Sequence, residues 1–339
     1  MLIVLRQKND QPLITHIQNL LKKKYGCESH IIGSNGRVIA VPGDTTMVEI
    51  DLIKNIEGVR SVDRVDRPYK LASRERKDRT EIKLSHGVTI GTRGTLVVMA
   101  GPCSIESEAQ LDETAALAKK HGATVLRGGA FKPRTGPYAF NGLGEDGLKF
   151  LKKAGEKYEM PVISEAMNEA QVDLMEKYVD IVQVGARNMQ NYDLLRRLGK
   201  CRIPVLLKRG LAATLEEFLL AAEYILAGGN PDVMLCERGI RTFEEEVRFT
   251  LALGSVPALR ELTHLPIIID PSHAAGKARW IADTSRASVA IGADGLIIEI
   301  HPRPEEALSD GPQALDEAHW TECMEGIRAI AGAMGKKLA

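Results

Sequence analysis

The chain has 339 residues, which is enough for one large domain and a second, smaller one. Lysine plus arginine and aspartate plus glutamate balance at 45 each, so no overall basic field attracts nucleic acid or an anionic membrane surface. No apolar run approaches the roughly 20 residues that span a bilayer, and the apolar start of the chain is too short for a signal peptide.

The five cysteines are scattered and never form a CxxC pair, a usage typical of reduced thiols rather than of a disulfide framework. We therefore expect a cytoplasmic protein in which Cys103 is available as a thiol. Cys103 follows directly on an apolar run, in the sequence "VVMAGPCSIES" at 97–107.

The first section of the chain has the pattern of a small α/β domain. Its order, βαββαβ, is that of a ferredoxin-like sandwich, and we assign it to residues 1–66 as a regulatory domain. The sequence "SNGR" joins two of its strands and is a strong hairpin signal. The predicted elements are, in chain order, a strand at 2–6, a helix at 12–25, strands at 29–33 and 38–41, a helix at 45–56 and a strand at 59–65.

Residues 67–80 are rich in charge and poor in apolar periodicity, which indicates a linker or an exposed crossing segment. The next stretch, 81–91, has the pattern of a short hairpin that caps whatever follows. We assign 81–339 to the catalytic domain.

Eight short apolar runs alternate with amphipathic stretches from residue 96 onward. Eight β-α units in roughly 250 residues predict a (β/α)₈ TIM barrel, and strands rich in Val, Ile and Leu suit a parallel sheet covered on both sides. A doubly wound open sheet is the alternative, but no GxGxxG or GxxxxGK[ST] loop follows any strand. The runs lie at 96–100, 124–128, 161–166, 180–186, 204–210, 233–239, 266–273 and 296–302.

Metal-ligating side chains stand where three of these strands end. Cys103, His273 and Glu299, with Asp310 as a further candidate, follow strands one, seven and eight, which are neighbours when a barrel closes. Each residue alone is more often structural, but thiolate, imidazole and carboxylate together suit Mn²⁺, Fe²⁺, Co²⁺ or Zn²⁺. The sequence therefore predicts a metal site in which Cys103 is a ligand.

Cations gather at the same strand ends. Clustered like charges at a barrel mouth repel one another unless anions neutralise them, so we expect more than one phosphorylated or carboxylated substrate. Arginine matches phosphate and carboxylate with two donors, and lysine adds a point charge. The cations are Arg127, Lys132, Arg134, Arg187, Lys208 and Arg238.

The motifs at these strand ends closely resemble, in order, those of the 3-deoxy-D-arabino-heptulosonate 7-phosphate synthase family, and more narrowly its type I subgroup with an N-terminal ferredoxin-like domain. The likeness covers the whole barrel, whereas the first section is similar only in layout. One departure is Gly136, where the family usually has serine after "KPRT". The motifs are "AGPCSIES", "LRGGAFKPRTGPYAFNGLG", "QVGARNMQN", "VLLKRG", "LCERGIRTF", "DPSHAAG" and "IIEIHPRPEEALSDG".

The resemblance implies a transferase that joins phosphoenolpyruvate to D-erythrose 4-phosphate and releases phosphate, the first step of the shikimate pathway to chorismate and the aromatic amino acids. It places a divalent metal, with Mn²⁺ first and Fe²⁺, Co²⁺, Zn²⁺ or Cd²⁺ as alternatives, on Cys103, His273, Glu299 and Asp310. It also assigns substrate anions to seven residues. The residues implied to bind phosphoenolpyruvate are Arg127, Lys132, Arg187, Lys208 and Arg238, and those implied to bind the aldose phosphate are Arg134 and Thr135.

Three residues are candidates for proton transfer under this resemblance. Lys132 is the candidate acid toward the aldehyde oxygen, and Glu165 and His301 are candidates for handling the attacking water. Most of the catalysis is expected to come from positioning two anions that repel each other.

Two alternatives remain open at this point. The first is 3-deoxy-octulosonate 8-phosphate synthase, which uses a five-carbon aldose phosphate and carries a different sequence after the lysine of "KPRT". The second is a barrel kept only for sensing a metabolite or binding a partner, which predicts damaged ligands that this chain does not have. The resemblance further implies a homotetramer, and we expect tyrosine or phenylalanine to be an allosteric effector of the first domain.

Overall fold

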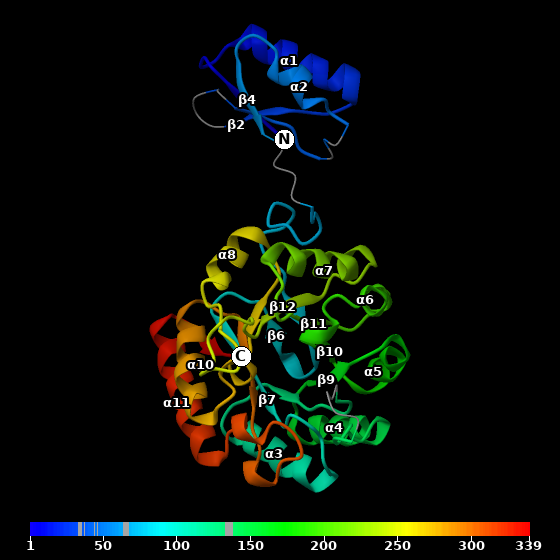
Figure 1. Ribbon diagram of the computed structural model, residues 1–339, viewed down its shortest axis with the longest axis vertical. Helices are drawn as coiled ribbons and strands as arrows, with labels where there is room; N and C mark the ends of the chain where they lie inside the picture. Colours follow the sequence, from blue (N-terminus) through cyan, green and yellow to red (C-terminus); the bar gives the residue numbers. More distant parts are fainter. Residues whose placement is uncertain (33–35, 37, 44, 46, 64–67, 133–137) are drawn as a thin grey trace. The chain divides into compact units, whose positions relative to one another are not determined.

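A computed structural model describes residues 1–32, 36, 38–43, 45, 47–63, 68–132 and 138–339. The chain divides into two compact units, Met1–Pro68 and Tyr69–Ala339 (Figure 1). No helix in these described ranges is long and apolar enough to cross a membrane.

The first unit is a small antiparallel sheet with two helices. The strand order is β2-β3-β1-β4, with β1 paired to both β3 and β4. Its core combines Ile3 and Leu5 of the central strand with Ile14, Ile17 and Leu21 of the first helix. The elements are β1 Leu2–Leu5, α1 Gln11–Tyr25, β2 His30–Ile32, β3 Val38–Ala40, α2 Ile50–Lys54 and β4 Val59–Asp63.

The first helix of this unit matches its prediction, and the second is shorter than predicted. Helix α1 begins where the Asp10 side chain accepts a hydrogen bond from the Leu13 N–H, and it ends at Gly26, whose φ of 68° closes the last turn. Helix α2 begins only at Ile50, because the preceding Glu49 has an extended backbone and makes no capping bond. The predicted hairpin turn "SNGR" falls largely outside the described residues.

Residues 69–80, part of the predicted linker, form a strap along the barrel unit. The Glu223 carboxylate on the barrel accepts hydrogen bonds from three consecutive backbone N–H groups, those of Lys70, Leu71 and Ala72, at 2.7–2.9 Å. The strap ends at Thr80, whose backbone N–H bonds to the carbonyl of His264 at 2.9 Å. This charged segment thus docks on the barrel through backbone hydrogen bonds. A hydropathy pattern does not reveal such bonds, which is why the sequence indicates a linker here.

A short hairpin of β5 Ile82–Lys83 and β6 Thr89–Ile90 precedes the barrel, as predicted. Ile82 and Ile90 are fully buried and pack with inward-facing strand residues such as Val97, Val125 and Ile268. The hairpin therefore closes one end of the barrel interior and leaves the other end for a site.

Eight parallel strands form the closed barrel. Each strand pairs with the next in sequence, and β14 pairs with β7 to close the ring. A short extra strand near the C-terminus, β15 Lys337–Leu338, also pairs with the start of β7. The eight strands are β7 Thr95–Gly101, β8 Val125–Arg127, β9 Val162–Ala166, β10 Ile181–Val184, β11 Val205–Lys208, β12 Val233–Glu237, β13 Ile267–Ile269 and β14 Gly295–Glu299.

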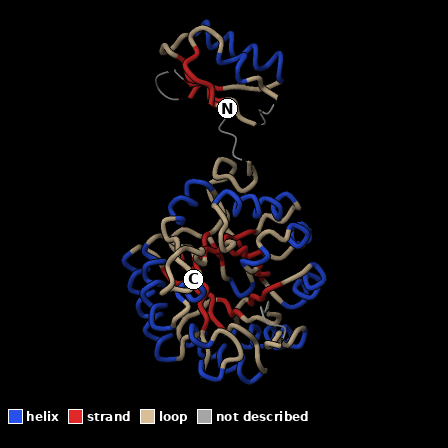
Figure 2. Tube along the Cα trace, viewed as in Figure 1, coloured by secondary structure: helices blue, strands red, loops and turns tan. Residues whose placement is uncertain are grey.

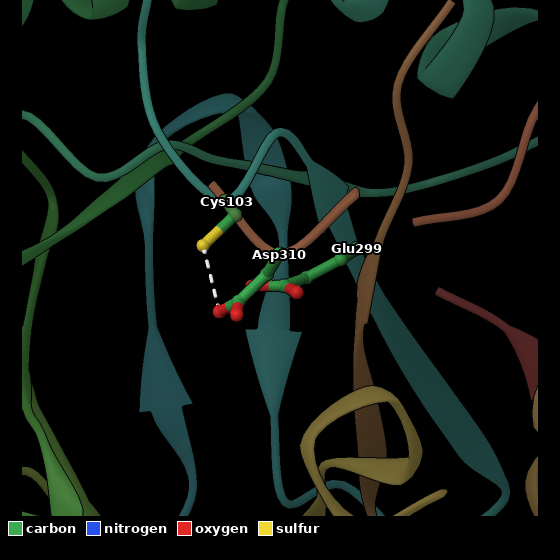
Figure 3. A group of neighbouring side chains, drawn as sticks. All are labelled: Cys103, Glu299 and Asp310. Carbon is green, nitrogen blue, oxygen red and sulfur yellow. Dashed lines mark hydrogen bonds between the residues drawn. The ribbon is translucent and has the colours of Figure 1, made fainter. Parts of the chain in front are cut away.

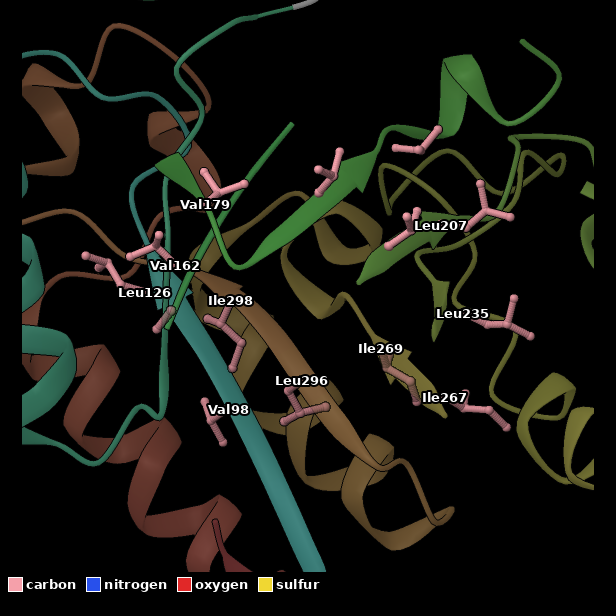
Figure 4. Packing of buried hydrophobic residues seen from close by; sticks show 14 of the residues in the cluster. Val98, Leu126, Val162, Val179, Leu207, Leu235, Ile267, Ile269, Leu296 and Ile298 are labelled. Carbon is pink, nitrogen blue, oxygen red and sulfur yellow. The ribbon is translucent and has the colours of Figure 1, made fainter. Parts of the chain in front are cut away.

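Helices surround this ring of strands, which confirms the predicted TIM barrel (Figures 1 and 2). Outward-facing residues such as Val98, Leu207 and Ile298 pack in the apolar layer beneath them (Figure 4). The open-sheet alternative is excluded by the β14–β7 pairing. The helices are α3 Glu108–Lys120, α4 Glu145–Tyr158, α5 Val172–Tyr178, α6 Tyr192–Gly199, α7 Leu215–Ala227, α8 Ser255–Leu262, α9 Pro271–Ala275, α10 Ile281–Ala290 and α11 Glu317–Ala333.

Candidate active site

A cavity of about 340 Å³ lies at the carboxyl ends of the strands, where the sequence predicts the site. Among the described residues, six arginines and lysines line it, against two carboxylates. Such an excess of positive charge in a cavity favours anionic ligands. The lining includes Arg127, Lys132, Glu165, Arg187, Lys208, Arg238, Arg248, His273 and Asp310.

Cys103 is brought to this site by a close approach of two strands. At Gly101, the last residue of β7, an added Cβ would lie 1.9 Å from the carbonyl oxygen of Arg127 at the end of β8. Only glycine fits there, so the chain turns at Gly101 and Pro102 and delivers the buried Cys103 thiol to the strand ends. The thiol donates a hydrogen bond to Asp310 Oδ2 at 3.2 Å.

Cys103, Glu299 and Asp310 each offer a ligand atom within 4.8 Å of the others (Figure 3). His273 Nε2 lies 3.5 Å from Glu299 Oε1 and 3.7 Å from Asp310 Oδ2. Ligand atoms bound at about 2.0–2.3 Å to one ion are roughly 3–4 Å apart. The two His273 contacts and the 3.2 Å approach of Cys103 Sγ to Asp310 Oδ2 lie in this range. The structure thus brings Cys103, Glu299 and Asp310 together and places His273 beside the two carboxylates.

Two further residues orient His273. Its Nδ1 atom lies 2.8 Å from Asp270 Oδ2, an ion-pair contact that is not aligned as a hydrogen bond. Lys208 Nζ contacts the same carboxylate oxygen at 2.5 Å. Burial opposes ionisation of Asp270, but His273 and Lys208 outweigh it and hold the pKa of this carboxyl well below its usual range. Carboxylates behind a ligating histidine commonly fix its ring in this way.

Glu299 is fully buried and held from both sides. Arg127 donates to its Oε1 at 2.7 Å, and Gln313 donates to its Oε2. Burial favours the neutral acid, but His273, Arg127 and Lys132 lower the pKa of Glu299, which keeps it a carboxylate. An ionised, oriented oxygen donor is what a divalent ion needs.

Lys132 stands beside the predicted ligands. Its Nζ lies 3.0 Å from the carbonyl oxygen of Cys103 and 2.9 Å from its sulfur. Burial alone would lower the pKa of Lys132, but the nearby Cys103 and the carboxylates Glu165 and Glu299 raise it, so the ammonium form is retained. Burial also raises the pKa of the Cys103 thiol to about 12, with Glu299 and Asp310 contributing.

The remaining predicted cations face the cavity from strands β10 to β12 and the loops after them. Arg187 and Lys208 both line it. The Arg238 guanidinium stacks on Phe249, with its carbon 4.3 Å from the ring centre, and burial lowers the pKa of this arginine. Its buried Nη1 atom has no hydrogen-bond partner among the described residues. A buried charged donor of this kind is suited to an anionic partner.

The candidates for handling water differ in position. Glu165 lines the cavity, and its Oε2 accepts a hydrogen bond from Gln183 at 2.9 Å. Glycine at position 185 leaves room for this side chain, because a Cβ there would lie 2.1 Å from Glu165 Oε1. His301 is buried and does not line the cavity; its Nε2 faces Glu106 at 3.6 Å. Arg134, Thr135 and Gly136 lie outside the described residues.

Several site residues escaped the sequence prediction. Arg248 bonds to Asp310 at 3.2 Å and to Gln313 at 2.6 Å, yet it comes from an irregular loop after β12. That loop is fixed by backbone bonds between Ile240 and Thr250, which carry no side-chain signal. For Asp270, the sequence signal of a place in the site is its position directly after a strand. Arg209, directly after β11, pairs with the buried Glu237 at 2.7 Å.

The fold and the cavity together define a (β/α)₈-barrel enzyme whose site, at the carboxyl ends of the strands, is built to hold anionic substrates. Comparison with known proteins identifies the enzyme family. Residues 79–328 match the DAHP synthetase I family. The chain is 46% identical to phospho-2-dehydro-3-deoxyheptonate aldolase of Thermotoga maritima, over the whole of both chains.

Solved structures agree with this match. A crystal structure of DAHP synthase from Thermotoga maritima has a TM-score of 0.80 at 45% identity, covering 100% of this chain and 98% of that one. A truncated form of the Thermotoga maritima synthase covers 80% of this chain and 99% of its own, with a TM-score of 0.75 at 46% identity. By contrast, the 2-dehydro-3-deoxyphosphooctonate aldolase of Syntrophotalea carbinolica is 31% identical over 72% of this chain and 93% of its own.

The chain belongs to the DAHP synthetase I family. The resemblance to the family is therefore confirmed, and with it the predicted condensation of phosphoenolpyruvate with erythrose 4-phosphate at the head of the shikimate pathway. The alternative five-carbon specificity rests on relatives of lower identity that cover less of the chain.

Proposed function

We propose that the barrel condenses the two substrates by holding their anionic groups on the cavity cations and polarising the aldehyde at the Cys103 cluster. The observation that carries this proposal is a cavity of the described barrel lined by six cations, by His273 and by Asp310, with Cys103 and Glu299 next to these two residues. The unpartnered Nη1 of Arg238 and the cavity-facing Arg187 and Lys208 supply donors for the phosphate and carboxylate of phosphoenolpyruvate.

The metal proposal assigns Cys103, His273, Glu299 and Asp310 as ligands and Mn²⁺ as the first candidate ion. A divalent ion there would act as a Lewis acid toward the aldehyde oxygen. When C3 of phosphoenolpyruvate bonds to the aldehyde carbon, that oxygen takes a proton. We assign this proton to Lys132, and the position of its retained ammonium, 2.9 Å from the Cys103 sulfur, supports the assignment.

The second half of the reaction requires water at C2 of the former phosphoenolpyruvate. Glu165 lines the cavity and is the group proposed to take the water proton. The resulting phosphohemiketal then loses phosphate. His301, which is turned toward Glu106, supports the site from behind.

The test is product formation with two aldose phosphates. The full chain, supplied with Mn²⁺ and phosphoenolpyruvate, is incubated with erythrose 4-phosphate or arabinose 5-phosphate, and products are identified by mass. We expect a seven-carbon product and rapid phosphate release with the four-carbon aldose. An eight-carbon product formed at an equal or higher kcat/KM would favour the octulosonate alternative.

We propose that the first unit is a ferredoxin-like regulatory domain. Its element order βαββαβ and strand order β2-β3-β1-β4 support the fold assignment. Every residue assigned to chemistry lies after position 100, which leaves this unit free to regulate. We propose tyrosine or phenylalanine as the effector, a homotetramer as the assembly and the cytoplasm as the location, each carried over from the sequence prediction.

A further inference from the structure

The loops that carry Cys103 and Asp310 are joined by the residues next to these two. Ser104 Oγ and Ser309 Oγ lie 2.5 Å apart, and both side chains are buried. One loop follows β7 and the other follows β14, 205 positions later in the sequence. A buried hydroxyl pair of this kind resists separation of the loops, because breaking it leaves two polar groups without partners.

Glu106 sits beside the serine pair and bonds to both loops. Its Oε1 accepts the Leu308 N–H at 2.8 Å and the Ser104 hydroxyl at 3.4 Å. Its side chain is only 12% exposed. Among the described residues no lysine or arginine forms an ion pair with it. The polar groups that face its carboxylate are the Leu308 N–H, the Ser104 hydroxyl and the His301 ring.

His301 presents a proton to this carboxylate. The backbone N–H of Arg303 donates to His301 Nδ1 at 3.0 Å, which assigns the lone pair to Nδ1 and the proton of the neutral ring to Nε2. Nε2 is buried without a hydrogen-bond partner and lies 3.6 Å from Glu106 Oε2. His301 stands two residues after Glu299, so Glu106 also faces the end of the strand that carries this ligand.

We propose that Glu106 is a positioning residue that ties together the three segments bearing Cys103, Asp310 and Glu299. This inference rests on the proposed metal role of those residues. Glu106 acts on the first through Ser104, on the second through the Leu308 N–H, and on the third through His301. It does not line the cavity.

The expected consequence is a loss of metal affinity. Without the carboxylate, the Leu308 N–H and the Ser104 hydroxyl lose an acceptor, and the 3.2 Å approach of Cys103 Sγ to Asp310 Oδ2 is no longer enforced from behind. Residues that orient ligands from outside the first layer typically change metal affinity about 10–100-fold. We expect a loss in this range for Glu106→Ala.

The experiment is a Co²⁺ titration of the metal-stripped full chain, followed by the thiolate-to-cobalt charge-transfer absorption. Glu106→Ala is compared with Glu106→Gln, which keeps an oxygen for the Leu308 N–H, and with Glu108→Ala, which removes a nearby carboxylate paired with the exposed Lys153. We expect the Co²⁺ dissociation constant to be 10–100-fold larger for Glu106→Ala, to be partly restored in Glu106→Gln and to be unchanged in Glu108→Ala.

The outcomes separate this inference from the proposed function. If the unaltered chain shows no thiolate band with Co²⁺, the metal role of Cys103 fails and the inference with it. If the band is present and Glu106→Ala binds Co²⁺ as tightly as the unaltered chain, only the inference is overturned. If Glu106→Ala does not fold, Ser104→Ala, Ser309→Ala and their double variant decide: equal affinity in all three overturns it, and a weakened, non-additive set supports it.

Discussion

Arg238 combines burial, stacking on Phe249 and a guanidinium nitrogen that bonds to no described residue. A charged hydrogen bond to a substrate anion is worth about 2 kcal/mol, or about 30-fold in binding. We expect Arg238→Ala to raise KM for phosphoenolpyruvate by about this factor, measured by phosphate release at saturating erythrose 4-phosphate. Arg241→Ala, at an exposed position in the following loop, is the control.

An unchanged KM for phosphoenolpyruvate in Arg238→Ala would contradict this assignment. Arg134→Ala, by contrast, should act mainly on KM for erythrose 4-phosphate. If both variants weakened the same substrate and spared the other, the division of the cations between the two substrates would be wrong.

Glu165 and His301 can be separated by their kinetics. Glu165 lines the cavity, whereas His301 Nε2 faces Glu106 at 3.6 Å and its Nδ1 accepts a hydrogen bond from the Arg303 N–H. We expect Glu165→Gln to lower kcat by about 10²–10⁴-fold with little change in either KM, the range typical of a lost general base. At saturating Mn²⁺, His301→Asn should keep most of the kcat. The reverse ranking would assign the water to His301.

At the scale of whole elements, the strap at 69–80 docks on the barrel partly through contacts with His264. Its ring lies between Thr80 Oγ1 at 2.8 Å from Nδ1 and the Leu71 carbonyl at 2.7 Å from Nε2. Burial lowers the pKa of His264, and the nearby cations Lys77, Arg74 and Arg76 lower it further, against the opposing bond to Leu71. The docked ring is therefore neutral, with Nε2 as donor.

This lowered pKa makes strap docking sensitive to acid. The undocked state has the higher pKa, near 6.5, and binds more protons, so docking is fully stabilised above about pH 6.5 and weakens as the pH falls below it. We expect the amide protection of Leu71, Ala72 and Thr80 to decrease between pH 7 and pH 5.5 in hydrogen exchange. His264→Gln, which does not titrate, should flatten the dependence, and the exposed-site control His16→Gln should not. Constant protection in the unaltered chain would contradict the account.

The elements also show where sequence reasoning works and where it stops. Alternation of apolar runs with amphipathic stretches predicts all eight barrel strands, and the strand ends predict that Cys103 and His273 both lie near Glu299. The docking of the strap could not be predicted from hydropathy. Its attachment uses backbone N–H groups and one carboxylate, Glu223, which is far away in the sequence. Arg248 was missed because long-range backbone pairing, not periodicity, brings its loop to the cavity.

At the scale of the whole molecule, the proposal assigns catalysis to the barrel unit and regulation to the first unit. Because residues 69–80 dock on the barrel, a truncated chain should begin at Tyr69 so that it keeps this strap. We expect the full chain to be inhibited by tyrosine or phenylalanine, and the chain from Tyr69 to keep turnover but lose the inhibition. A folded but inactive truncation, or equal inhibition of both chains, would remove the regulatory assignment.

The central claim is that the Cys103, His273, Glu299 and Asp310 cluster holds a divalent ion on which the condensation depends. The most direct measurement is phosphate release from phosphoenolpyruvate and erythrose 4-phosphate by the full chain after chelation, with residual metal quantified by elemental analysis, and again after Mn²⁺ is added. We expect turnover to vanish in the stripped protein and to return with Mn²⁺, and Cys103→Ser to need a higher Mn²⁺ concentration. Full turnover by a chain shown to be metal-free would contradict the account.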